Sequence, residues 1–144
     1  MRIAALFLLL CAVASAQSLE QQILQTVNAE RRARGVAPLR EDPQLTTAAS
    51  SHSRNMERRN FFSHDDPDKG NLRQRLKAAG VDCTACAENI FSTSPTRDLA
   101  RAVVRAWMNS RGHRENLLNR MYTHTGVGVE TGKEVLITQI FAAR

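Results

Sequence analysis

The stretch GVGVETGKEVLITQIF, residues 126–141, decides the fold class of this chain of 144 residues. It contains two runs rich in β-branched and apolar residues, 126–129 and 135–141, around a polar turn at 131–134. This pattern predicts a terminal antiparallel β-hairpin. The pair Ile90-Phe91 is a candidate third strand of the same sheet.

Helices are predicted ahead of this hairpin by apolar spacing and by capping residues. Four helix starts carry a polar cap or a proline suited to the first turn: Ser18, Asp42-Pro43, Asn71 and Ser94-Pro95. Gly35 and Gly80 end the first and third helices, Gly112 interrupts the fourth, and residues 116–118 form one more turn. Helices gathered around a small antiparallel sheet predict an α+β fold.

The N-terminus has the composition of a secretory signal peptide. Arg2 precedes an apolar run at residues 3–13, and Ala14-Ser15-Ala16 forms a small-residue cleavage site. We expect cleavage after Ala16, which leaves residues 17–144 as one exported domain. No other apolar run is long enough to cross a membrane, so the mature protein is expected to be secreted, or periplasmic, and not an integral membrane protein.

Cleavage also changes the cysteine count and the charge. Cys11 leaves with the signal, so two of the three cysteines remain. A lipid anchor on Cys11 is the alternative, but Leu10 stands where lipoprotein signals usually carry a small residue. Loss of Arg2 lowers the net charge only from +6 to +5.

The remaining basic residues are mostly arginines at helical spacing, which is typical of solvated helix faces. Aromatic residues make up only 5% of the chain. Nucleic-acid readers more often interleave aromatics with a basic patch, so we expect no nucleic-acid partner. Adhesion to an anionic extracellular polymer through the arginines stays open.

Three short segments place metal-competent side chains beside apolar or turn residues: 61–67, 87–90 and 107–114. The first and third carry His64 and His113, which lie far apart in sequence, unlike the local histidine pairs of zinc-protease helices. Spacing alone therefore does not decide whether each histidine is a structural residue or a metal ligand.

Short motifs follow one another in a specific order along nearly the whole mature chain. They are VNAER at 27–31, Gly35, Leu39, FSH at 62–64, ENI at 88–90, WMNS at 107–110, GHR at 112–114, NLL at 116–118 and GVG at 126–128. In this order they resemble the small bacterial secreted form of the CAP superfamily (cysteine-rich secretory proteins, antigen 5 and pathogenesis-related 1). The resemblance implies a three-layer α-β-α sandwich, which agrees with the helices and hairpin above.

The resemblance also implies a central cleft with two histidines and two acidic residues. His64, Glu88 and His113 match three of these positions, whereas the second acid falls at Ser110, so the set of four is incomplete. Some family members bind zinc or another divalent ion through the histidines. We therefore expect His64 and His113 to be able to hold such a metal.

The chemistry of these side chains supports two functions. Two neutral imidazoles can bind zinc and leave positions open for water or a ligand. Glu88 would then bind that water, act as a base toward it or orient a histidine. Our leading hypothesis is a monomeric binding module for a divalent metal, a small molecule, a lipid or an envelope or extracellular partner. A zinc-dependent hydrolase with Glu88 as its base is the alternative, which the missing second acid disfavours.

Other polar residues have simpler interpretations. Export favours a disulfide between Cys83 and Cys86, with free thiols or a Cys₂His₂ zinc site with His64 and His113 as alternatives. His52 lies on an apolar helical stripe and is expected to be buried and hydrogen-bonded, whereas His124 is expected at the surface.

Overall fold

The structure is a computed structural model that describes residues 16–144. The predicted signal peptide, residues 1–16, lies outside the described residues apart from Ala16. Four strands form one sheet in the order β1-β3-β4-β2. They are β1 (Arg40–Glu41), β2 (Cys86–Thr93), β3 (His124–Thr131) and β4 (Val135–Ala142). The predicted hairpin is the β3–β4 pair, and the candidate strand at Ile90-Phe91 is the middle of β2.

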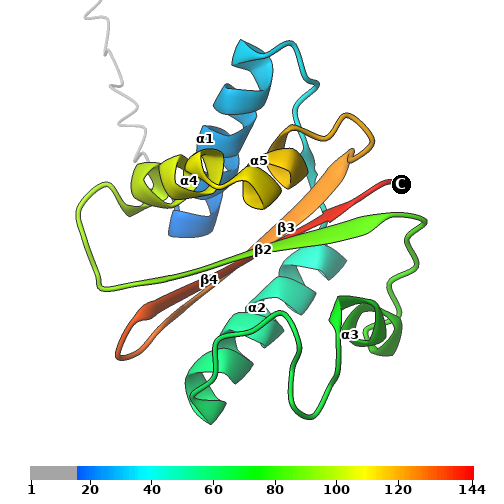
Figure 1. Cartoon of the computed structure of the whole chain (residues 1–144), viewed down its shortest axis with the longest axis vertical. Helices are drawn as coiled ribbons and strands as arrows, with labels where there is room; N and C mark the ends of the chain where they lie inside the picture. Colours follow the sequence, from blue (N-terminus) through cyan, green and yellow to red (C-terminus); the bar gives the residue numbers. More distant parts are fainter. Residues whose placement is uncertain (1–15) are drawn as a thin grey trace, which may run out of the picture.

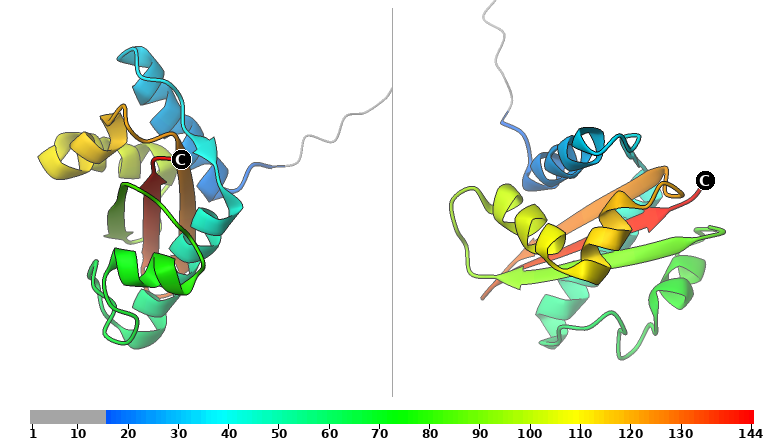
Figure 2. Two further views of the ribbon diagram at one scale, coloured as in Figure 1. Left: turned by 90° about the vertical axis from the view of Figure 1, so that its right-hand side faces the viewer. Right: turned by 45° about the horizontal axis from the view of Figure 1, so that its top comes forward.

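Five helices cover the two faces of this sheet (Figures 1 and 2). They are α1 (Leu19–Ala33), α2 (Pro43–Arg59), α3 (Leu72–Ala78), α4 (Leu99–Asn109) and α5 (Arg111–Leu118). Helices α1, α4 and α5 lie on one face, and α2 and α3 lie on the other. The expected three-layer α-β-α sandwich is confirmed. Among the helices of residues 16–144, none is long and apolar enough to cross a membrane.

Side chains along β3 and β4 point alternately to the two faces of the sheet, and this alternation explains how the helices pack on both faces. In β4, Val135, Ile137 and Phe141 pack into the core under α1 and α4, while Leu136 and Ile140 face α2. In β3 the residues on the α2 face include Gly126 and Gly128. A Cβ atom on Gly128 would overlap the backbone of Ala49 and Ser50. Helix α2 therefore packs backbone to backbone on β3, and the GVG motif at 126–128 makes this approach possible.

Gly128→Ala is expected to lower the free energy of unfolding by at least about 2 kcal/mol, because its methyl group forces α2 away from β3. Urea denaturation followed by circular dichroism measures this change. Gly112→Ala is the matched control, because a Cβ on that helical glycine meets no atom within 4 Å. That control is expected to stabilise the protein by about 0.5–1 kcal/mol. A Gly128→Ala protein as stable as the wild type would contradict the close packing.

Three details differ from the sequence-based expectations. The helix expected to open at Ser94-Pro95 begins instead at Leu99, because Asp98 adopts the left-handed conformation (φ 52°), which interrupts helical geometry. Helices α4 and α5 are separated by the extended backbone of Ser110, and Gly112 lies inside α5. The sheet is also mixed, because β1 pairs in parallel with β3.

One buried arginine ties α1 to the chain that leads out of α5. Arg31, which is 1% exposed, donates from Nε to the carbonyl of Ala37 at 2.7 Å. Its two Nη groups donate to the carbonyls of Leu117, Asn119 and Tyr122 at 2.7–3.1 Å. The arginine of the VNAER motif therefore serves as a structural link.

Candidate functional site

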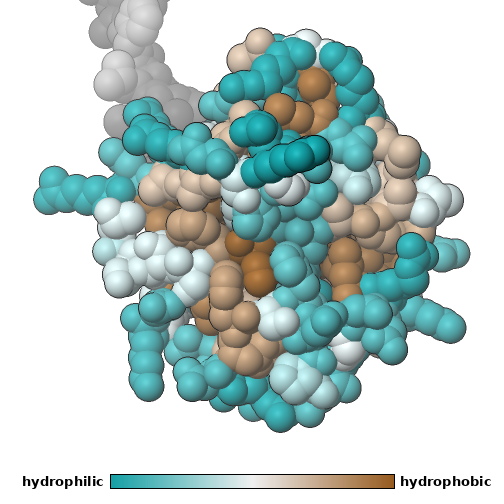
Figure 3. Space-filling model, viewed as in Figure 1, coloured by the Kyte–Doolittle hydropathy of each residue, from teal (hydrophilic) through white to brown (hydrophobic). Residues whose placement is uncertain are grey.

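Three of the four predicted cleft residues, His64, Glu88 and His113, lie at β2, one of the two edge strands of the sheet. Glu88 points to the α2–α3 face, where His64 reaches it from the loop after α2. His113 comes from α5 on the opposite face. Figure 3 shows hydrophilic side chains over most of this side of the molecule, with apolar side chains gathered near its middle. The site therefore spans β2, with His64 on one face of the sheet and His113 on the other.

Glu88 is the buried centre of the site. Its side chain is 2% exposed, and its two oxygens lie 2.9 and 2.8 Å from Nη2 of Arg75. The Nδ1 atom of His64 lies 2.9 Å from Oε1 of Glu88. Because a carboxylate accepts hydrogen bonds, Nδ1 carries the proton in the neutral His64 ring, and Nε2 of that neutral ring has a free lone pair. The His64 ring is half exposed, so this lone pair is available to a ligand.

Arg75 also fixes the loop that carries His64. Its Nη2 donates to the His64 carbonyl at 3.0 Å, in addition to its contacts with Glu88. Its side chain is only 5% exposed, because α3 packs it against β2. One guanidinium nitrogen therefore sets both the backbone of His64 and the carboxylate that orients the His64 ring.

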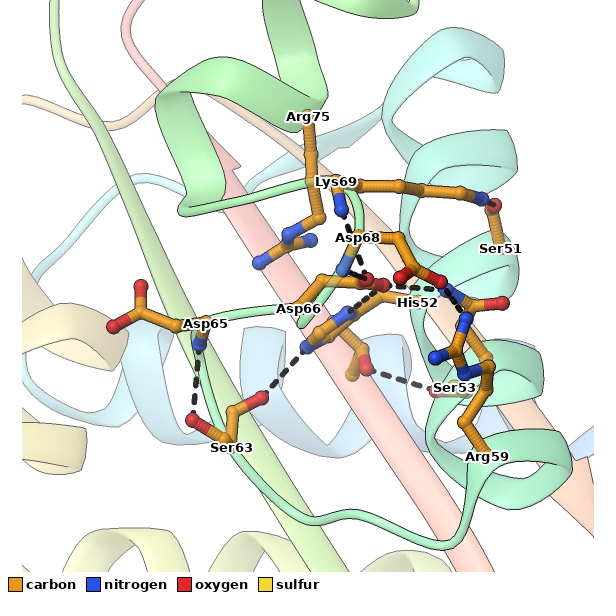
Figure 4. A network of polar contacts seen from close by, with 12 residues as sticks. Ser51, His52, Ser53, Arg59, Ser63, Asp65, Asp66, Asp68, Lys69 and Arg75 are labelled. Atoms are coloured by element: carbon orange, nitrogen blue, oxygen red, sulfur yellow. Dashed lines mark hydrogen bonds and ion pairs between the residues drawn. The ribbon is translucent and has the colours of Figure 1, made fainter.

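A second set of contacts shapes the same loop (Figure 4). His52 of α2 is buried, as predicted, and its Nε2 lies 2.9 Å from the Ser63 carbonyl. Asp66 accepts from the backbone amides of Asp68 and Lys69 at 2.9 and 3.0 Å and from the side chain of Asn55. Although burial raises the pKa of Asp66, these hydrogen bonds outweigh it and hold that pKa below its ordinary value.

Asparagines attach α5 to β2 on the other side. Asn89 donates to the His113 carbonyl at 3.1 Å, and Asn116 donates to the Asn89 side chain at 2.9 Å. Ser110 stands at the break between α4 and α5, and its carbonyl accepts from the Arg114 amide at 2.8 Å. His113 thus lies on a short helix that is fixed to the strand that carries Glu88.

The two cleft histidines have opposite pKa shifts. The hydrogen bond with Glu88 raises the pKa of His64 above 6.5, and this gain exceeds the opposing effect of burial. Burial, followed by the charge of His64, lowers the pKa of His113 below 6.5. At neutral pH His113 is therefore the better proton-free ligand, and His64 becomes one only as the pH rises.

An NMR titration of the histidine rings is expected to find His64 titrating above 6.5 and His113 below 6.5. Glu88→Gln removes the charged partner and is expected to lower the pKa of His64. His64→Gln is expected to raise the pKa of His113, because it removes the neighbouring positive charge. The reverse order of the two titrations in the wild type would contradict this electrostatic arrangement.

Comparison with known proteins decides the family. The family model for the cysteine-rich secretory protein family (CAP) matches residues 24–141. The chain belongs to this family. The Bacillus subtilis protein YkwD is 38% identical to this CAP chain over 122 residues, which make up 84% of this chain and 46% of YkwD. This CAP chain therefore spans less than half the length of that relative.

Solved structures share the CAP fold. An extracellular protein of Bacillus anthracis that contains an SCP domain has 36% identity and a TM-score of 0.79, over 88% of this chain and 40% of its own. An outer surface protein of Borrelia burgdorferi has 19% identity and a TM-score of 0.78, over 88% of this chain and 92% of its own. At that lower identity the match concerns the fold alone.

Two histidines of this CAP domain have ring nitrogens that could serve as ligands of a divalent metal. His113 offers a neutral imidazole, and His64 offers Nε2 with its Nδ1 fixed by a carboxylate, a common arrangement in zinc proteins. Within residues 16–144, no group of three or more His, Cys, Asp and Glu side chains converges as metal ligands. Water or a bound ligand would therefore complete the coordination of a metal held by His64 and His113.

The structure joins Cys83 to Cys86 in a disulfide at the start of β2, in agreement with the expectation from export. Because their sulfurs bond to each other, they are not ligands of a Cys₂His₂ site with the CAP histidines. His124 is half buried as the first residue of β3, and its Nδ1 lies 2.9 Å from the Thr123 hydroxyl.

Sequence reasoning missed Arg75, which holds the CAP cleft together. It precedes the buried Leu76 on α3 but stands between the exposed Arg73 and Lys77, so it resembled a solvated basic residue. The available signal was its place on the same helical face as Leu72 and Leu76, where an arginine needs a buried partner.

Proposed function

We propose that this chain is an exported binding module of the CAP family whose His64–His113 cleft holds a divalent metal ion, with zinc the best match to two imidazoles. The observation that carries the proposal is the buried Arg75–Glu88 pair, which orients the half-exposed ring of His64 and leaves Nε2 free. A bound metal would supply Lewis acidity and open coordination positions for an anionic or carbonyl ligand.

Glu88 acts in this proposal as the residue that positions His64. Both of its oxygens accept from Arg75, and Oε1 also meets His64. A general base must hold a water with a free lone pair in line with its target. Because the Glu88 lone pairs point to protein donors, the same geometry favours binding over zinc-dependent hydrolysis.

Export is supported by two independent lines. The first is the sequence pattern of residues 1–16, and the second is the description of the Bacillus anthracis and Borrelia burgdorferi proteins as extracellular and outer-surface. The disulfide between Cys83 and Cys86 suits an oxidising compartment.

Isothermal titration with zinc at about pH 7.5 tests the metal site, because a histidine must lose its proton to bind metal and metal affinity therefore rises with pH. The wild type is expected to bind one zinc ion per chain. His64→Ala and His113→Ala are each expected to lose at least about 100-fold in affinity, and Glu88→Gln about 10–100-fold.

His124→Ala is the matched control, because that histidine lies at the start of β3 and is hydrogen-bonded to Thr123. Its zinc affinity is expected to equal that of the wild type. Wild-type protein that binds no zinc, or a His124→Ala protein that loses binding while His64→Ala retains it, would overturn the proposed site.

A further inference from the structure

The net positive charge of the described chain lies in one of its two helical layers. Residues 16–36 and 97–122, which form α1, α4 and α5 with their flanks, carry nine arginines and four acidic side chains, a net charge of +5 with histidine neutral. Residues 37–96 and 123–144 carry ten basic and ten acidic side chains and are neutral overall. Because α1, α4 and α5 cover the same face of the sheet (Figure 2), this face presents a positive potential to solvent.

A groove of about 360 Å³ lies between α1 and α4 on this face. Arg101 and Arg105 of α4 line one side of it, and Glu30 and Arg34 of α1 line the other. Glu30 is ion-paired with Arg34, so these two charges cancel. The side chains of Arg101 and Arg105 are exposed, and they make no hydrogen bond or ion pair within residues 16–144. These two guanidiniums are therefore available to an anion.

Arg114 of α5 continues this row of arginines at the end of α4. Its Nη1 donates at 2.9 Å to the carbonyl of Met108, a residue that also lines the groove. Arg114 is itself exposed. Helical residues four apart are about 6 Å apart along the axis, so Arg101, Arg105 and the guanidinium held at Met108 follow one another at roughly one-turn intervals. The three arginines form a row along α4.

The chemistry of this row defines its partner. A guanidinium is always charged, and its paired N–H donors match the oxygens of a phosphate. The aromatic residues of this layer are Trp107 and Tyr122, and both are buried. The layer therefore offers no exposed ring on which a nucleobase could stack and none that could insert into a membrane. A row of cations without aromatic side chains fits a flexible polymer that is recognised through its phosphates alone.

We propose that the row formed by Arg101, Arg105 and Arg114 binds a linear phosphodiester polymer with short polyol linkers, such as a chain of glycerol phosphate units. Each guanidinium pairs with a separate phosphate along the chain, and the groove beside α1 accommodates the linkers. Such binding would hold an exported domain on an anionic extracellular polymer. It needs neither a metal ion nor the cleft histidines.

Fluorescence anisotropy with a labelled glycerol phosphate oligomer, added to metal-free protein in the presence of a chelator, tests this surface. Three neutralised phosphates predict that the logarithm of the association constant falls with the logarithm of the salt concentration with a slope of about −2. Affinity is therefore expected to fall about 100-fold for a tenfold rise in salt. Arg101→Gln combined with Arg105→Gln is expected to weaken binding at least about tenfold and to reduce the steepness of the slope to about 1 or less.

Arg58→Gln combined with Arg73→Gln is the matched control, because it removes the same charge from exposed positions on α2 and α3. Its affinity is expected to stay within about twofold of the wild type, since solvent ions screen distant charges. His64→Ala is expected to bind the oligomer like the wild type, which separates this surface from the metal site.

Three results would overturn the proposal. They are the absence of binding at about 0.05 M salt, an affinity that does not change with salt, and an equal loss of affinity in the control pair. Tighter binding of single-stranded oligothymidylate with the same number of phosphates, or of phosphatidylglycerol vesicles, would also overturn it. Either result would assign the surface to a nucleic acid or a membrane instead.

Discussion

Arg75→Met is expected to lower the free energy of unfolding by about 3–5 kcal/mol, because it leaves the buried carboxylate of Glu88 without its charged partner. The methionine keeps most of the apolar volume of the arginine stem. The lowered free energy of unfolding therefore measures the lost ion pair and not a newly created cavity. The same change removes the hydrogen bond to the His64 carbonyl. Zinc affinity is therefore expected to fall about 10–100-fold, since His64 loses its orientation.

The double variant Arg75→Met with Glu88→Gln separates pairing from packing. A neutral amide costs less to bury than an unpaired carboxylate. The double variant is therefore expected to lose at least about 1 kcal/mol less unfolding free energy than the two single variants lose when their losses are added. Urea denaturation at constant pH measures all three variants. Additive effects, or an Arg75→Met protein within about 1 kcal/mol of the wild type, would show that the pair contributes little.

Arg31→Ala is expected to destabilise the protein by at least about 3 kcal/mol. The change removes all hydrogen bonds from one guanidinium to four carbonyls that join α1, the loop after it and the chain beyond α5. Each buried carbonyl left without a donor adds about 1–3 kcal/mol of cost, less what water and relaxation recover. Because Arg31 holds the end of α5, the amide protons of α5, the helix that carries His113, are expected to exchange faster with solvent in the variant.

Two further variants sharpen this prediction. Arg32→Ala, at the exposed neighbouring position, is expected to change stability by less than about 0.5 kcal/mol. Arg31→Lys keeps the charge but not the planar fork, so it is expected to recover less than half of the loss. Full stability of Arg31→Lys would mean that charge alone, and not the set of four carbonyl contacts, stabilises the structure around α5.

Local signals account for the parts of the fold that the sequence predicted. The capping box at Ser18 and the caps at Asp42 and Asn71 all form as expected, because each involves residues within one turn. The β3–β4 hairpin follows equally from a local pattern of period two. Strand β1 was missed because two residues, Arg40–Glu41, carry no period.

The site depended on contacts that no local pattern contains. The resemblance pointed to His64, Glu88 and His113, but not to the guanidinium that holds Glu88 from another helix. Arg75 and Glu88 come from separate elements, and their pairing follows only from how α3 packs on β2. The same holds for His52, whose burial the helical stripe predicted and whose contact with the Ser63 carbonyl it could not.

Anomalous X-ray diffraction at the zinc edge, on crystals grown with zinc at about pH 7.5, tests the central claim most directly. The proposed metal site predicts one strong peak about 2.0–2.1 Å from Nε2 of His64 and from a ring nitrogen of His113, with Glu88 still hydrogen-bonded to Nδ1 of His64. A map without a peak at these histidines, or with its strongest peak at His124, would contradict it.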